Sequence, residues 1–164
     1  MKRFFLLSTF YFLLSGCGFS PMHSTAPVGN NDVVMRDIFI APISGTNGID
    51  MRNALRAKFG TDNNQATAKY VLEVDLRAPA TVFKALQTTG DATWQEVRLV
   101  ATYTLKRTEN DKVVFRTTDT ASESYTFVRD LVAAQASYNN AVQGAIRVLS
   151  EKIEVRVTAK LSNK

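Results

Sequence analysis

The sequence contains one cysteine and one histidine in 164 residues, and this shortage limits the chemistry open to it. Cys17 has no second cysteine to pair with, which excludes an intramolecular disulfide. Catalytic Cys–His pairs and metal sites built from histidine and thiolate need such residues close together, and His23 has no partners nearby. The nucleophile-elbow, Walker and dinucleotide-binding glycine motifs are also absent. We therefore expect no enzyme, and neither catalytic residues, metal ligands nor a cofactor.

The sequence also lacks a large excess of charge of either sign. The formal net charge is +5, and Lys2 and Arg3 contribute two of these charges from a segment that we expect to be removed. The +3 that remains is far from the dense basic face of a nucleic-acid-binding domain. We therefore expect no nucleic acid among the partners.

Long hydrophobic runs are absent after Leu14, and the run that ends there is short. Lys2 and Arg3 precede eleven residues, Phe4 to Leu14, that only Ser8 and Thr9 interrupt. This pattern is typical of a signal peptide, whereas a membrane-crossing helix needs about 20 residues. We interpret residues 1–16 as a lipoprotein signal peptide and expect no transmembrane helix in the mature chain.

The cysteine follows this run directly, in the order Leu14, Ser15, Gly16, Cys17. Small residues before a cysteine match the bacterial lipobox, in which a peptidase cuts before the cysteine once its thiol carries a diacylglycerol. We predict signal cleavage between Gly16 and Cys17 and lipidation of Cys17, with acyl chains such as palmitate forming a stable anchor. Gly18 stands where enteric-type sorting uses aspartate for inner-membrane retention, which indicates the outer membrane and a periplasm-facing domain. A coincidental cysteine after an ordinary signal peptide is the alternative.

Beyond this point the sequence predicts a tether and then one domain. Residues 17–31 carry two prolines and two glycines without periodicity, which is typical of a flexible linker. His23 lies in this linker, where we interpret it as a solvated residue. Residues 32–164 have the length of a single periplasmic domain.

Hydrophobic periodicity predicts the elements of that domain. It predicts a strand ending at Pro42, a helix over about 49–59 and an alternating strand over 69–79. This order suggests a crossover between parallel strands. Alternating runs then predict a hairpin over 94–128, and a helix follows from Asp130, a candidate N-cap, to about Leu161. Residues 79–93 fit either a strand or a loop. The order β-α-β-β-β-α predicts an α+β two-layer sandwich, with a four-stranded mixed sheet and two helices on one face.

We call the sheet face that we expect to be exposed to solvent the wet face, and some of its polar residues invite a functional interpretation. Glu73 and Asp75 point to the same side of a strand, where a carboxylate pair could serve a periplasmic hydrolase. We favour the alternative that both carboxylates are solvated charges beside Arg77. Cations on the outer strand faces or at the hairpin turn could bind phosphate or acidic sugar, and ordinary solubilising charge is the alternative interpretation. These cations are Arg77, Arg98, Lys106, Arg107, Lys112 and Arg116.

Several stretches together resemble one protein family. "GCGFSPMH" places Gly-Phe-x-Pro directly after the lipobox cysteine, and "FIAPISGTNGIDMRNAL", "YVLEVDL", "LVATYTL" and "ASYNNAVQGAI" follow in order. These segments resemble the LPS-assembly lipoprotein family LptE in its alphaproteobacterial form. The resemblance implies a non-catalytic α+β plug and assembly factor inside the outer-membrane β-barrel LptD, which would deliver lipopolysaccharide to the cell surface. It also implies lipopolysaccharide contacts through basic side chains, for which the six cations above are the candidates.

A different envelope lipid-trafficking lipoprotein is the main rival interpretation. PqiC-like proteins share a lipobox and a strand–helix–strand start. They carry a Tyr-Thr-Leu run shortly after the cysteine, whereas the run Tyr103-Thr104-Leu105 lies deep in this domain.

Overall fold

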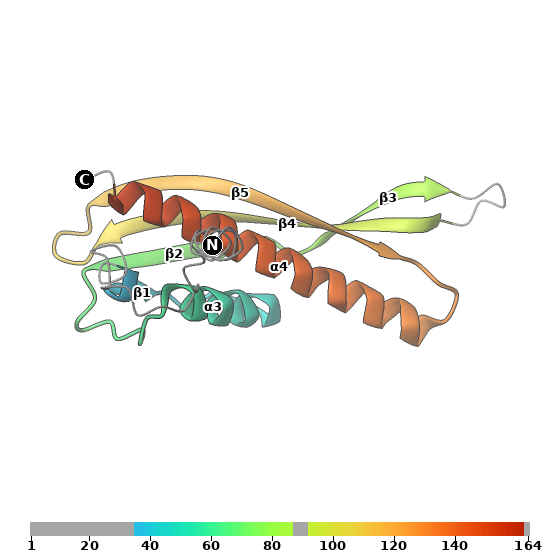
Figure 1. Cartoon of the computed structure of the whole chain (residues 1–164), viewed down its shortest axis with the longest axis horizontal. Helices are drawn as coiled ribbons and strands as arrows, with labels where there is room; N and C mark the ends of the chain where they lie inside the picture. Colours follow the sequence, from blue (N-terminus) through green and yellow to red (C-terminus); the bar gives the residue numbers. More distant parts are fainter. Residues whose placement is uncertain (1–34, 87–91, 163–164) are drawn as a thin grey trace, which may run out of the picture.

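A computed structural model of the protein describes residues 35–86 and 92–162 (Figure 1). Their backbone alternates between a long sheet and two helices. In chain order the elements are β1 (Ile38–Ile40), α3 (Thr46–Phe59), β2 (Tyr70–Leu76), β3 (Ala80–Leu86), β4 (Ala92–Arg107), β5 (Val113–Thr126) and α4 (Leu131–Ser162).

β4 organises the sheet because it is long enough to serve two partners in succession on one side. β2 pairs antiparallel with its second half and β3 with its first half, while β5 pairs with it along the other side. β1 pairs parallel with β2, as the predicted crossover requires. The described residues thus form a mixed five-stranded sheet, in which β3 and the start of β4 come from the segment that the sequence left open.

Both helices pack against one face of this sheet. Met51 and Leu55 of α3 and Leu149 and Ile153 of α4 are fully buried in the same core as Leu99 of β4. The opposite sheet face is polar, with threonines and serines at alternate positions of β4 and β5. The predicted fold class, an α+β two-layer sandwich with two helices on one face, is confirmed.

Local residues explain where the helices begin and end. Gly60 ends α3 in the left-handed conformation, at φ 57°, which glycine adopts without strain. Asp130 caps α4 as predicted, because its Oδ1 accepts hydrogen bonds from the amides of Val132 and Ala133 at 2.8 and 3.1 Å. α4 has 32 residues and extends for about 48 Å. In the described part of the chain, neither α4 nor α3 has the length and apolarity that crossing a membrane requires.

A buried polar group joins α4 to the sheet. The Tyr103 hydroxyl donates to Asp119 Oδ2 at 2.6 Å, and Arg156 reaches the same carboxylate with Nε at 2.7 Å and its terminal nitrogen at 2.9 Å. Asp119 is 8% exposed, so its charge depends on these two partners. Burial, and then the hydrogen bond to Asp119, raise the pKa of Tyr103 well above its ordinary value.

The outer edge of β1 is closed by side chains. The amide of Ile40 donates to Asn63 Oδ1 at 2.6 Å, and its carbonyl accepts from Arg52 Nε at 3.1 Å. The carbonyl of Ile38 accepts from the Thr61 hydroxyl at 2.8 Å. This short edge strand therefore offers few free main-chain groups to another chain.

Candidate functional site

At one end of the molecule β3 ends, β4 begins, β5 ends and α4 begins (Figure 1), and residues of these segments carry exposed apolar side chains. We call this end the apolar tip and define it by Phe83, Trp94, Phe127, Val128, Leu131 and Val132. Leu131 and Val132 are 80% and 81% exposed. Large solvent-exposed apolar side chains near one another are typical of a binding surface. The apolar tip is the strongest candidate for one in this molecule.

The apolar tip lies far from the point where the described chain begins. Met35 contacts Thr158 near the end of α4, with its Sδ 3.4 Å from the hydroxyl. Leu131, at the start of the same helix, is therefore about 40 Å away. A chain that enters at one end of the domain thus presents its apolar tip at the other.

The predicted basic residues do not form one cluster. Arg98 and Lys106 both lie on the wet face of β4, but eight residues apart, which is about 27 Å along a strand. Each is held by a carboxylate, Arg98 by Glu96 at 3.0 Å and Lys106 by Glu73 at 2.6 Å. These two cations are therefore partly neutralised.

The other four predicted cations make no ion pair with another described residue. Arg77 follows β2 in the middle of the sheet, where its amide donates to Val100. Arg107 and Lys112 lie at the turn between β4 and β5. Arg116 is exposed on the wet face, opposite Thr104. These four cations are the ones open to a ligand.

Glu73 and Asp75 share the wet face, as the alternation predicted. They line a shallow hollow of about 280 Å³ together with Thr104 and Arg116. Glu73 is already paired with Lys106, and Asp75 lies opposite Thr102. The hollow combines opposite charges and threonine hydroxyls, an arrangement typical of a solvated sheet face.

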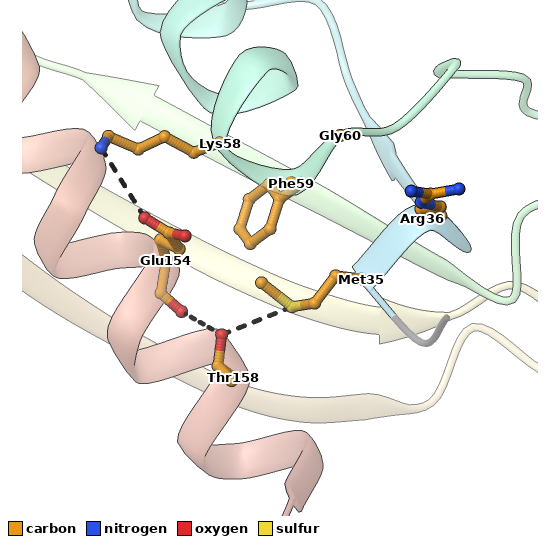
Figure 2. A pocket seen from close by; sticks show the side chains of 7 residues that line it. All are labelled: Met35, Arg36, Lys58, Phe59, Gly60, Glu154 and Thr158. Atoms are coloured by element: carbon orange, nitrogen blue, oxygen red, sulfur yellow. Dashed lines mark hydrogen bonds and ion pairs between the residues drawn. The ribbon is translucent and has the colours of Figure 1, made fainter. Parts of the chain in front are cut away.

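A second hollow, of about 300 Å³, lies between the end of α3 and the end of α4 (Figure 2). Lys58 bridges the helices to Glu154 at 3.7 Å, and the Thr158 hydroxyl donates to the Glu154 carbonyl at 2.8 Å. Phe59 and Met35 fill its floor and are almost fully buried. The Lys58 ion pair joins the two helices above these buried side chains, so we interpret this hollow as part of the packing.

The predicted lipidation site lies in a part of the chain that precedes the described residues. Gly16, Cys17 and His23 all precede residue 35 and lie outside the described residues.

Sequence reasoning missed most of the apolar tip. Trp94 lies where the predicted hairpin begins, and half of its surface is exposed there. Phe127 continues the alternation of β5 and Leu131 the helical spacing of α4, so both fit the pattern of a covered apolar face. Both positions lie beyond the layer that would cover them.

The fold is shared with solved bacterial lipoproteins. A lipoprotein from Caulobacter crescentus matches with a TM-score of 0.68 and 18% identity, over 82% of this chain and 97% of that one. The minor lipoprotein of Acinetobacter baumannii gives 0.60 at 18% identity, over 76% and 92%. Rare lipoprotein B of Shewanella oneidensis gives 0.59 at 13% identity, over 77% and 96%. At these identities the likeness establishes a common fold. No family model and no curated protein sequence matches this chain.

Proposed function

We propose that this chain is an outer-membrane lipoprotein, anchored by acyl chains on Cys17, that partners an LptD-like β-barrel in lipopolysaccharide transport. It acts as a non-catalytic plug and assembly factor, with its domain facing the periplasm. The observation that carries this proposal is the apolar tip, a surface that needs a partner. The resemblance of the sequence to the LptE family and the likeness in fold to rare lipoprotein B support it.

The position of the apolar tip supports a role as a plug. It lies about 40 Å from the start of the described chain, so a domain tethered at that start can extend its tip away from the tether. The wet sheet face carries mainly threonine, serine and charged residues. Such a face stays hydrated inside a polar barrel interior while the apolar tip binds protein or lipid.

Contact with lipopolysaccharide is the finer part of this proposal. Arg77, Arg107, Lys112 and Arg116 are the predicted cations without an ion pair to another described residue. Guanidinium and ammonium groups bind phosphate through charge-assisted hydrogen bonds. We expect these four to contribute more to binding than Arg98 and Lys106, which already pair with carboxylates.

Affinity capture of the mature, lipidated protein from detergent-solubilised outer membranes tests the barrel partnership. We expect one large β-barrel protein to be recovered with it. Its reproducible absence would contradict the proposal.

A matched pair of variants assigns the contact to the apolar tip. Leu131→Ser removes an apolar side chain within the tip, and Val155→Ser removes one that is 66% exposed outside it. We expect barrel recovery to fall about tenfold for Leu131→Ser and to stay unchanged for Val155→Ser, since tenfold corresponds to about 1.4 kcal/mol of binding energy. Equal recovery for both variants would place the contact elsewhere.

A further inference from the structure

The outer edge of β5 is a row of main-chain groups that faces away from the sheet. β5 is the last strand on its side of β4. The amide of Arg77 donates to the carbonyl of Val100 at 3.0 Å, so the main chain of Val100 faces β2 and not β5. Val100 lies opposite Thr120, and the main chain of Thr120 must therefore face outward.

The same orientation recurs at every second residue of β5. The pairing of β4 with β5 has no register shift between residues 116 and 126, so the alternation is uninterrupted there. The outward-facing amides and carbonyls belong to Arg116, Thr118, Thr120, Ser122, Ser124 and Thr126. Within the described ranges, one hydrogen bond reaches this row, from Lys152 Nζ to the Thr120 carbonyl at 2.8 Å.

The two edges of the sheet therefore differ in how far side chains cap their main-chain groups. Asn63, Arg52 and Thr61 close the three-residue edge of β1. The much longer edge of β5 is capped at one carbonyl and has no proline in its sequence. Proteins normally protect such an edge, because exposed main-chain groups invite another strand. The edge of β5 has the geometry of a site for strand addition.

Positive charge flanks this edge. A hollow of about 470 Å³ between β5 and α4 is lined by Arg116, Arg156 and Lys160, with Phe115, Thr117 and Ala159. Asp119 balances Arg156, but neither Arg116 nor Lys160 forms an ion pair with another described residue. Lys152 adds a cation beside Thr120. A strand added here would find cations on both of its faces.

We propose that the outer edge of β5 binds an extended, acidic peptide segment of another protein by strand addition. The alternating amides and carbonyls of the edge match the main chain of an extended peptide residue by residue, a repeat that a lipid headgroup lacks. Carboxylates on the added strand approach Arg116 on the wet face and Lys160 on the helix face. The incoming strand displaces Lys152 from the Thr120 carbonyl. This site is separate from the apolar tip and does not depend on the barrel partner.

Synthetic peptides added to the mature full-length protein in detergent test the proposal by fluorescence anisotropy. The probe is a labelled ten-residue peptide that repeats two glutamates and two valines, so that each face of the extended peptide carries glutamate. The first control replaces glutamate by lysine. The second keeps the glutamates but carries methyl groups on four consecutive central nitrogens, which removes the N–H donors of both edges over that stretch. We expect the first peptide to bind and both controls to bind at least about tenfold more weakly.

Protein variants place the binding on this edge. Ser122→Pro removes an outward amide without removing a rung of the β4–β5 ladder, because the main chain of Ser122 faces outward. Ser122→Ala is its matched control. We expect about tenfold weaker binding of the acidic peptide to Ser122→Pro, no change for Ser122→Ala, and several-fold weaker binding to Lys160→Glu. Circular dichroism verifies that each variant is folded, and the methylated peptide tests the edge without changing the protein.

Three results would overturn the proposal. The first is equal binding of the methylated and unmethylated acidic peptides, which would reduce the contact to charge alone. The second is binding of phosphatidylglycerol vesicles, lost in Lys160→Glu, by a protein that binds no peptide. The third is a dimer in sedimentation that Ser122→Pro abolishes, because the edge would then serve a second copy of the chain.

Discussion

α4 contributes to two regions that differ in how far their apolar residues are covered. In its second half, Leu149 and Ile153 are fully buried between α3 and the sheet. In its first turn, Leu131 and Val132 remain about four-fifths exposed. The residue types are similar, so the difference comes from the layers around them. α3, β1 and β2 lie at the packed end, whereas among the described residues only β3, the start of β4 and the end of β5 lie at the end of the molecule where α4 begins.

The difference separates stability from binding within one helix. Burying an apolar side chain contributes about 1.5 to 3 kcal/mol to folding, and leaving it exposed contributes almost nothing. The packed end therefore stabilises the fold, and the apolar tip remains available for a partner. Substitutions along α4 and its contacts test this separation.

Leu149→Ala should have the largest effect, because it opens a cavity in the core of the packed end. We expect the free energy of unfolding to fall by about 3 kcal/mol, measured by urea denaturation. Leu131→Ala removes the same atoms at the apolar tip and should change it by less than about 0.5 kcal/mol. Similar losses for both variants would show that the first turn of α4 is covered in solution.

Arg156→Ala should rank second. It leaves the buried carboxylate of Asp119 with the Tyr103 hydroxyl as its remaining partner, and we expect a loss of about 2 kcal/mol. Lys160→Ala, four residues further along α4, removes a cation without an ion pair to a described residue and serves as the control. Arginine at position 156 would be unimportant for folding if the two variants unfolded at the same urea concentration.

Tyr103→Phe removes one hydrogen bond and should cost about 1 kcal/mol at neutral pH. The pKa of Tyr103 is raised by burial and by Asp119, so the folded state favours the protonated phenol. The stability that this preference provides is complete below pH 10, the approximate pKa of an unfolded tyrosine, and is lost as the pH rises above it. The difference in melting temperature between wild type and variant should therefore shrink above pH 10. A difference that stays constant up to pH 11 would contradict this account.

The smallest signal should come from Trp94, the sole tryptophan, which is half exposed at the apolar tip. We expect Leu149→Ala to leave its emission maximum unchanged in the folded protein. Binding of the barrel partner should shift the emission to shorter wavelength and protect it from acrylamide quenching, because the partner covers the tip. Unaltered quenching in the purified complex would place the contact elsewhere.

The sequence predicted those parts of the fold in which periodicity and burial coincide. β2 and β4 alternate cleanly because Leu72, Val97 and Leu99 face a continuous core. β3 could not be decided, because its pairing with β4 is irregular after Phe83 and that side chain is largely exposed. Without a buried face, a strand leaves little periodic signal in its sequence.

The polar contacts were harder to predict than the strands. Asp119 lies in phase with Phe115 and Ala121, so an acid at a core position was visible in the sequence. Its partner Arg156 comes 37 residues later on a helix, and no spacing rule connects the two. The apolar tip was hidden for a related reason: the spacing that includes Leu131 cannot show where the sheet beneath it ends.

The length of β4 also determines how the domain responds to force. One uninterrupted strand reaches from the packed end to the apolar tip, and thirteen of its residues pair with β5. Tension between the two ends runs parallel to these strands and loads their hydrogen bonds together, in shear. Tension across the strands would break them one after another. A domain held in a membrane at one end and pulled by a partner at the other would therefore behave as a stiff rod and would transmit the load without unravelling.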